Sequence, residues 1–327
     1  METNETSTPQ HIDTNPLAAL IENVQSQVGK VIVGQHDMVE LLIAGLLADG
    51  HILIEGVPGV AKTLTARLLA KLIDAQFSRI QFTPDLMPSD VLGTNVFNPQ
   101  TATFQFKAGP IFSNIVLIDE INRAPAKTQA ALFEVMEERQ ITVDGTTHKL
   151  AAPFMVIGTQ NPIEHEGTYR LPEAQLDRFM MKIVVHYPSL EEEIKILERH
   201  NQAAINEMLE NIQPIISSQV LQNARQQVSA IYIEPKLLEF IAKIVWETRN
   251  DKSLYIGASP RASIALLRVA KAIGVIRGRN FVIPEDIIYA APTVLRHRIS
   301  ITPEKEMEGG TTDDVLKEII ARIEIPR

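Results

Sequence analysis

Short apolar runs alternate with amphipathic helical stretches between Pro16 and about Tyr187. Such runs, each followed by a helical pattern, are typical of a parallel sheet that is covered by helices. We expect strands at residues 52–55, 78–82, 115–119, 154–159 and 181–185. The pattern therefore predicts one α/β domain over residues 16–187.

Two segments of this domain show the shorter period of a β-hairpin. Polar and apolar residues alternate from Val96 to Phe106 around an Asn-Pro turn. Residues 140–143 and 147–150 flank Asp144-Gly145, and Asp-Gly between alternating residues is a strong hairpin signal. We interpret both hairpins as insertions into the α/β pattern.

Helix signals dominate after Pro188. Ser189 followed by Glu192 is a capping box that opens a helix, and Pro235, Pro260 and Pro284 each suit the first turn of another. Residues 188–327 are therefore predicted to form a small all-α domain. The first residues, 1–15, are polar and acidic and are predicted to be a disordered tail.

The amino-acid composition limits the class of protein to which this chain can belong. A hydrophobic content of 45% and a mean hydropathy of +0.02 are typical of soluble globular proteins. With no cysteine, the 327-residue chain has no disulfides, iron–sulfur centres or thiol catalysis, and the cytoplasm is the expected compartment. The longest apolar stretch, around residues 41–48, is too short to insert into a membrane. A net charge of −9 disfavours a nucleic-acid partner.

The segment from Gly56 to Thr63 follows a predicted strand and precedes a predicted helix. A phosphate chain needs free backbone N–H groups at a helix N-terminus, a compact cation and a hydroxyl for Mg²⁺. Gly59, Lys62 and Thr63 supply these in order. Ala61 stands where the general pattern has glycine, and we interpret it as already helical, with a negative φ. The segment predicts a triphosphate site, although alone it also fits a glycine-rich turn.

Two carboxylates, Asp119 and Glu120, close the apolar run that precedes them. Many sheets end on an acid, so this pattern alone is weak. After a phosphate loop it suits nucleotide hydrolysis, in which one acid holds Mg²⁺ and the other orients the attacking water. We assign Asp119 to the metal and Glu120 to the water.

Two further polar residues follow the later apolar runs. Asn161 ends residues 154–161 and is placed to hold the attacking water or the γ-phosphate, while Asn161-Pro162 also fits a plain turn. Arg178 follows a short predicted helix. It suits an arginine finger that stabilises charge on the γ-phosphate, or a surface salt bridge with Asp177 or Glu173.

Together these motifs resemble the MoxR family of AAA+ ATPases. The resemblance runs from about Val31 to Ile299 and includes Ala61 in place of glycine. Its most specific part is the string from Asp119 to Lys127. The other segments that carry it are Val31 to Gln35, Gly56 to Thr63, Gly158 to Pro162, Leu171 to Phe179 and Gly257 to Ala262.

The resemblance implies an AAA+ parallel αβα sandwich with two β-hairpin insertions and a helical lid, assembled into ATP-dependent rings that are typically hexamers. ATP and Mg²⁺ would be the cofactors. Asp119 and Glu120 would be the Walker B pair, Asn161 sensor 1, Arg178 the finger in the neighbouring site, and Arg261 sensor 2, acting on its own or a neighbour's nucleotide. The nucleotide would contact Val33, Gly34, Gln35, Pro58, Gly59, Val60, Ala61, Lys62, Thr63 and Leu64.

Three functions fit these features. The first is an ATP hydrolase that remodels a protein client, as family members are thought to do, often alongside a protein with a von Willebrand factor A domain. The second is a DNA-directed motor, which the acidic balance disfavours. The third is a non-hydrolysing nucleotide switch, which would be expected if Glu120, Asn161 or Arg178 were absent.

Overall fold

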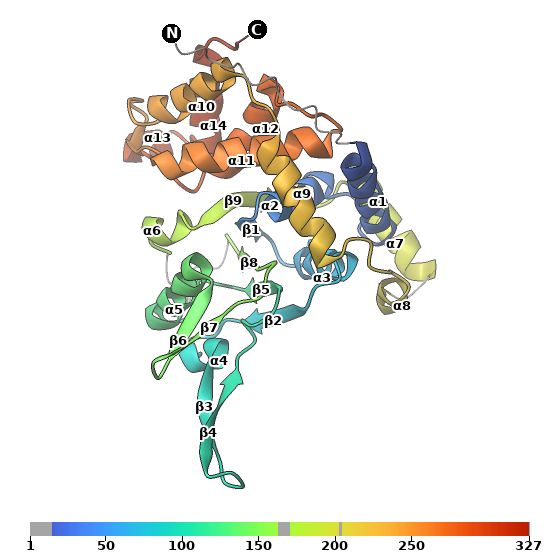
Figure 1. Ribbon diagram of the computed structural model, residues 1–327. Coiled ribbons are helices and arrows are strands. Elements are labelled where there is room, and N and C mark those ends of the chain that lie inside the picture. Colours follow the sequence, from blue (N-terminus) through green and yellow to red (C-terminus); the bar gives the residue numbers. More distant parts are fainter. Residues whose placement is uncertain (1–14, 163–170, 203–204, 327) are drawn as a thin grey trace, which may run out of the picture.

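The computed structural model describes residues 15–162, 171–202 and 205–326. In this part of the chain five parallel strands form the central sheet in the order β2-β5-β8-β1-β9 (Figure 1). All five predicted strands are confirmed, with boundaries shifted by at most two residues. They are β1 (His51–Gly56), β2 (Phe77–Gln81), β5 (Ile115–Asp119), β8 (Met155–Gln160) and β9 (Phe179–Val185).

Both faces of the sheet are buried, which explains the continuous apolar runs. Ile52 and Ile54 of β1 belong to a core cluster with helices on one face, whereas Leu53 belongs to a second cluster on the other face. The first cluster includes α1 (Asn15–Val31), α2 (His36–Leu47) and α3 (Lys62–Leu72), and the second includes α4 (Pro88–Leu92) and α5 (Ala126–Glu138).

Both predicted hairpins are present as separate two-stranded sheets. Strands β3 (Gly93–Asn98) and β4 (Thr103–Ala108) form a ribbon that projects from the α/β domain (Figure 1). Strands β6 (Gln140–Val143) and β7 (Thr146–Lys149) are joined by Asp144 and Gly145, with φ values of 47° and 80°. Positive φ at both central residues is the reason that Asp-Gly favours this tight turn.

The region after residue 188 is mainly helical, as predicted. Ser189 and Glu192 form the predicted capping box, in which the Ser189 N–H donates to Glu192 Oε2 at 2.8 Å. A short antiparallel ladder of β10 (Leu254–Ile256) and β11 (Ser300–Ile301) was not anticipated. The helices are α7 (Leu190–Gln202), α8 (Ile205–Glu210), α9 (Ser218–Ala230), α10 (Pro235–Glu247), α11 (Pro260–Ile276), α12 (Pro284–Leu295), α13 (Pro303–Met307) and α14 (Thr312–Arg322).

Helix α11 joins the helical region to the α/β region, because it packs against α1 and α2 as well as against α10 and α12. Its buried residues share one core cluster with β1. The predicted tail over residues 1–15 lies outside the described residues except for Asn15, which begins α1. Within the described residues no helix is both long and apolar enough to cross a membrane.

Candidate nucleotide-binding site

The phosphate loop connects the end of β1 to the start of α3, as predicted. The interpretation of Ala61 as helical is wrong: Ala61 precedes α3 as its N-cap residue, with a left-handed φ of 60°. Gly59 is also left-handed, with φ of 88°. Glycine favours this conformation because a Cβ costs about 1–2 kcal/mol there, so Ala61 places strain within the loop.

Lys62 and Thr63 open α3 directly after the loop. The ammonium of Lys62 donates to the Gly56 carbonyl at 2.6 Å, so its side chain folds back over the loop. A helix N-terminus faced by a lysine is a ready site for anionic oxygens. Thr63 follows in the same first turn, where a hydroxyl suits a phosphate-bound Mg²⁺.

The two acids occupy different environments at the end of β5. Asp119 is buried, and its carboxylate accepts from Arg79 Nε at 2.6 Å and from Thr159 Oγ1 at 3.1 Å. Glu120 is half-exposed and pairs with Arg123 at 2.9 Å. Its φ of 57° is left-handed, and its N–H donates to Thr159 Oγ1 at 3.2 Å. Strained backbone of this kind clusters at functional sites.

Thr159 on β8 positions both acids, a role that was not predicted, although Thr159 lies in the segment Gly158 to Pro162 that carries the resemblance. Because β8 lies between β5 and β1, Asn161 follows β8 between the acids and the phosphate loop. The fold thus gathers Lys62, Thr63, Asp119, Glu120 and Asn161 at one edge of the sheet.

The residues at this edge suit Mg²⁺, which does not need a full set of protein ligands. In the described part of the chain no three His, Cys, Asp or Glu side chains cluster as a metal site. Mg²⁺ in nucleotide sites is held by one or two protein oxygens, phosphates and water. The Thr63 hydroxyl and the buried Asp119 carboxylate are such oxygens.

The segment Val33 to Gln35 lies near the carboxyl end of β9. Gly34 and Gln35 have φ values of 66° and 55°, and Gln35 donates from Nε2 to the His186 carbonyl at 3.2 Å. His186 directly follows β9, the neighbour of β1 in the sheet. A Cβ at Gly34 would collide with the Glu192 carboxylate of α7.

Arg178 and Arg261 lie away from this edge. Arg178 comes just before β9, at the amino end of the strand, and donates to the Phe133 carbonyl at 2.6 Å. Arg178 also pairs with Glu137 of α5, so its partner is neither Asp177 nor Glu173. Arg261, at the start of α11, pairs with the other oxygen of Glu137 at 3.0 Å.

The six residues of β1 separate the two arginines from the phosphate loop. At about 3.3 Å per residue this is about 20 Å, more than an arginine side chain spans.

Asp177, the neighbour of Arg178 in sequence, is paired with another arginine: its carboxylate accepts from Arg298 Nε at 2.7 Å, and Arg298 also donates to the Phe179 carbonyl at 2.7 Å. These bonds fix the start of β9.

Comparisons with known proteins agree with this arrangement. Residues 51–181 match the family model of the ATPase family associated with various cellular activities (AAA), and residues 246–319 match the AAA lid domain. Chaperone MoxR1 of Mycobacterium tuberculosis is 41% identical, across 94% of this chain and 82% of its own length. The chain belongs to the MoxR family of AAA+ ATPases.

Two other relatives of this MoxR-family chain match almost end to end. An uncharacterised protein, YeaC of Bacillus subtilis, is 45% identical over 95% of this chain and 96% of its own length. The crystal structure of a candidate ATPase from Cytophaga hutchinsonii superimposes with a TM-score of 0.88 and 43% identity. The superposition covers 96% of this chain and 97% of the C. hutchinsonii chain. The AAA+ core and the helical lid are therefore shared along nearly the whole chain.

Proposed function

We propose that this MoxR-family protein binds and hydrolyses ATP with Mg²⁺ in a ring of identical subunits, and that hydrolysis remodels a protein client. The observation that carries the proposal is the division of the candidate residues between the two ends of the sheet. Residues suited to binding and water activation gather at the carboxyl end, and both arginines lie at the amino end.

At the carboxyl end, each group has a distinct task. Lys62 neutralises the phosphates, Thr63 and Asp119 hold Mg²⁺, and Glu120 orients the attacking water. Asn161 follows the middle strand β8 and fixes the water or the γ-phosphate. The bound metal would neutralise charge that develops on the phosphates.

At the amino end, Arg178 and Arg261 act in trans on the nucleotide of a neighbour. Neither arginine reaches its own phosphate loop, which is about 20 Å away. Both are held by one carboxylate, that of Glu137, so they present two guanidinium groups together. A ring in which each amino end meets the next carboxyl end completes every site.

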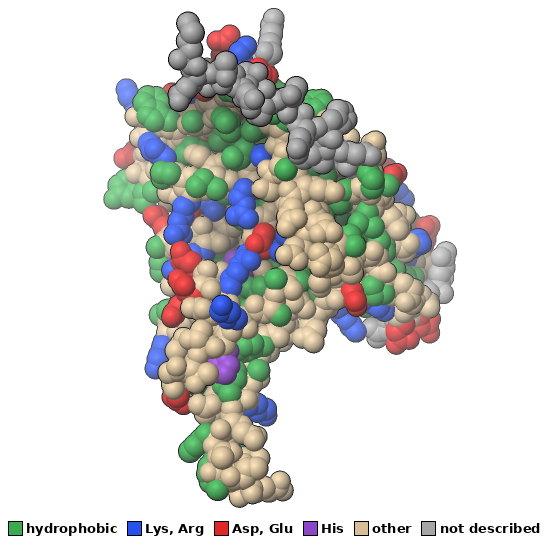
Figure 2. Space-filling model, viewed as in Figure 1, with side chains coloured by type: hydrophobic (Ala, Val, Ile, Leu, Met, Phe, Trp, Pro, Cys, Tyr) green, Lys and Arg blue, Asp and Glu red, His purple; other side chains and the backbone are tan. Residues whose placement is uncertain are grey.

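The client role is supported by two features. The relative from M. tuberculosis carries the name chaperone, and the β3–β4 hairpin exposes aromatic side chains. Phe97 and Phe104 are 50% and 72% exposed, and their rings lie 5.3 Å apart. Figure 2 shows hydrophobic side chains along this projecting ribbon. Exposed aromatic pairs on a projecting loop commonly bind other chains.

Three finer assignments belong to the same proposal. The ring is a hexamer, a protein with a von Willebrand factor A domain is a partner, and the complex works in the cytoplasm. We divide the chain into a tail at residues 1–15, an AAA+ core at 16–187 and a lid at 188–327.

Mixing two inactive variants tests the shared site. Arg178→Ala should bind ATP and lose turnover by roughly 10³-fold or more, whereas Lys62→Ala should fail to bind. In the mixture, an intact phosphate loop from one variant meets an intact finger from the other, so turnover should reappear and should rise with protein concentration. Native mass spectrometry shows whether mixed rings form. Mixed rings without turnover would rule out Arg178 as a trans finger.

A further inference from the structure

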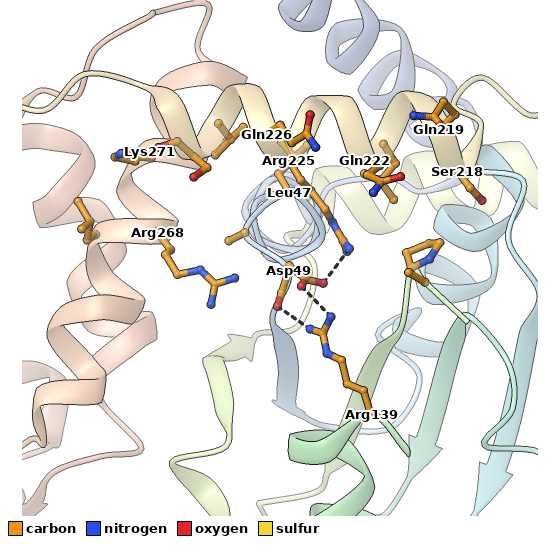
Figure 3. Close-up of a pocket in the computed structure, with 17 residues that line it drawn as sticks. Leu47, Asp49, Arg139, Ser218, Gln219, Gln222, Arg225, Gln226, Arg268 and Lys271 are labelled. Atoms are coloured by element: carbon orange, nitrogen blue, oxygen red, sulfur yellow. Dashed lines mark hydrogen bonds and ion pairs between the residues drawn. The ribbon is translucent and has the colours of Figure 1, made fainter. Parts of the chain in front are cut away.

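A cavity of about 740 Å³ lies at the amino ends of β1 and β8, between the α/β region and helices α9 and α11 (Figure 3). Asp49 lies two residues before β1 and Pro153 two residues before β8. This cavity, here called the basic pocket, is therefore at the opposite end of the sheet from the phosphate loop. No role assigned above involves it. The charged side chains that line it are those of Asp49, Arg139, Arg225, Arg268 and Lys271.

The basic pocket carries excess positive charge. Asp49 pairs with Arg139 at 2.8 Å and with Arg225 at 2.7 Å (Figure 3). Arg268 reaches toward the same carboxylate from α11 and forms no ion pair within the described residues. Lys271 donates to the Ser229 carbonyl at 2.7 Å and forms no ion pair in the part of the chain that the structure describes. Four cations and one carboxylate therefore line the pocket of a chain whose net charge is −9.

The basic pocket continues the surface that bears the trans arginines. Arg268 follows Arg261 by seven residues on α11, which is two helical turns and hence the same face. Arg139 follows Glu137, the partner of both arginines, by two residues. Figure 2 shows blue side chains gathered in the hollow between the helical region and the α/β region. A neighbour that approaches the two arginines would also face the basic pocket.

Helix α7 has the complementary character. Its apolar residues Leu190, Ile194 and Leu197 are 76%, 48% and 66% exposed and recur at the spacing of one helix face. Glu191 and Glu193 are exposed in its first turn. An amphipathic helix with its apolar face in water is typical of a segment that docks in a groove of another chain.

Helix α7 lies at the nucleotide end of the molecule. Arg199 of α7 donates to the Gly29 carbonyl at 2.7 Å, and Glu192 of α7 packs on Gly34. Because α7 and the basic pocket are at opposite ends of the sheet, they do not meet within one chain. Two complementary surfaces at opposite ends of one subunit generate a head-to-tail contact between copies.

We propose that α7 of one copy docks into the basic pocket of the next copy. The inference rests on the ring of the proposed function and supplies a contact beside the shared site. Glu191 and Glu193 meet Arg268 and Lys271, while the exposed apolar stripe covers the apolar part of the pocket lining. The contact would place the phosphate loop of one subunit next to Arg178 of its neighbour.

Charge reversal tests the contact. The pocket variant is Arg268→Glu with Lys271→Glu, and the α7 variant is Glu191→Lys with Glu193→Lys. Each should still bind ATP, yet need at least about tenfold more protein for half-maximal assembly with ATP in sedimentation velocity. The swap variant, with all four changes, should regain assembly. A 1:1 mixture of the two separate variants should also assemble, with the two variants alternating, because both mixed contacts pair opposite charges whereas each variant repels its own copies.

The control reverses two exposed lysines of α10 that lie outside the pocket, Lys236→Glu with Lys243→Glu, and should assemble normally. A pocket variant that assembles like the wild type overturns the docking and leaves the proposed function intact. A swap variant that binds ATP but stays unassembled also overturns it. A pocket variant that assembles but loses stabilisation by pyrophosphate would make the pocket a small-anion site. Wild type that never assembles with ATP would instead refute the ring.

Discussion

Ala61→Gly should stabilise the protein, although glycine usually destabilises. The φ of 60° at Ala61 costs alanine about 1–2 kcal/mol relative to glycine. Against this, the greater freedom of glycine in the unfolded chain costs about 0.5–1 kcal/mol. The Ala61 methyl also packs against the core, and its loss costs a few tenths of a kcal/mol, so we expect a net gain of about 0.5 kcal/mol.

Ala130→Gly is the matched control. Ala130 is exposed within α5, where φ is helical and glycine costs about 1 kcal/mol. The two substitutions remove the same methyl group, so their difference of about 1.5 kcal/mol isolates the backbone effect. It corresponds to roughly 2–4 °C between their thermal midpoints, measured without nucleotide.

The sign of the difference decides the outcome. If Ala61→Gly lowers the midpoint as much as Ala130→Gly does, residue 61 is not left-handed in solution and the strain assigned to the loop is absent. ATP affinity should stay within about threefold of the wild type, because glycine retains the loop conformation.

Two further predictions concern hydrolysis and acid stability. Lys62→Ala should abolish ATP binding, whereas Glu120→Gln should retain binding and lose turnover, and equal ATP affinity of the two variants in titration calorimetry would contradict their roles. Burial lowers the pKa of His51 to about 4. Between pH 6.5 and pH 4 this imidazole is therefore protonated in the unfolded chain but remains neutral in the folded chain. The contribution of His51 to stability is therefore fully present above pH 6.5 and is lost toward pH 4, by up to about 3 kcal/mol. His51→Gln should reduce the pH dependence in urea titrations across that range, and the part that remains includes buried His297, whose pKa is also lowered by burial.

Local sequence signals located the elements of this fold well. The five strands, the two hairpins and the proline-initiated helices follow from apolar runs, from Asp144-Gly145 and from the positions of proline. Parallel order then places residues after β1, β5 and β8 at one edge, so the position of the candidate nucleotide site follows from the sequence. These signals are enough to predict the elements, because each signal depends only on residues within one short segment.

The features that were predicted wrongly or missed depend on contacts between distant parts of the chain. The backbone at Ala61 and Glu120 is left-handed because the surrounding tertiary structure imposes this conformation. Alanine and glutamate do not favour positive φ, so the sequence does not predict it. Thr159 bonds to Asp119 from forty positions away in sequence. The basic pocket draws side chains from five separated segments, so neither its volume nor its charge is visible in any one of them.

Glu137 gives the proposed shared site a switch that sequence patterns could not suggest. Its carboxylate holds Arg178 and Arg261 while no neighbour is present, and ion pairs that remain partly open to solvent are individually weak. The γ-phosphate of a neighbouring ATP carries more charge than one carboxylate and accepts from both guanidinium groups. We therefore expect an ATP-loaded neighbour to draw both arginines away from Glu137, whereas a neighbour with ADP lacks the phosphate that would compete. In the proposed ring, the arginines would thus respond to the nucleotide state of the adjacent subunit through a local competition between two anions.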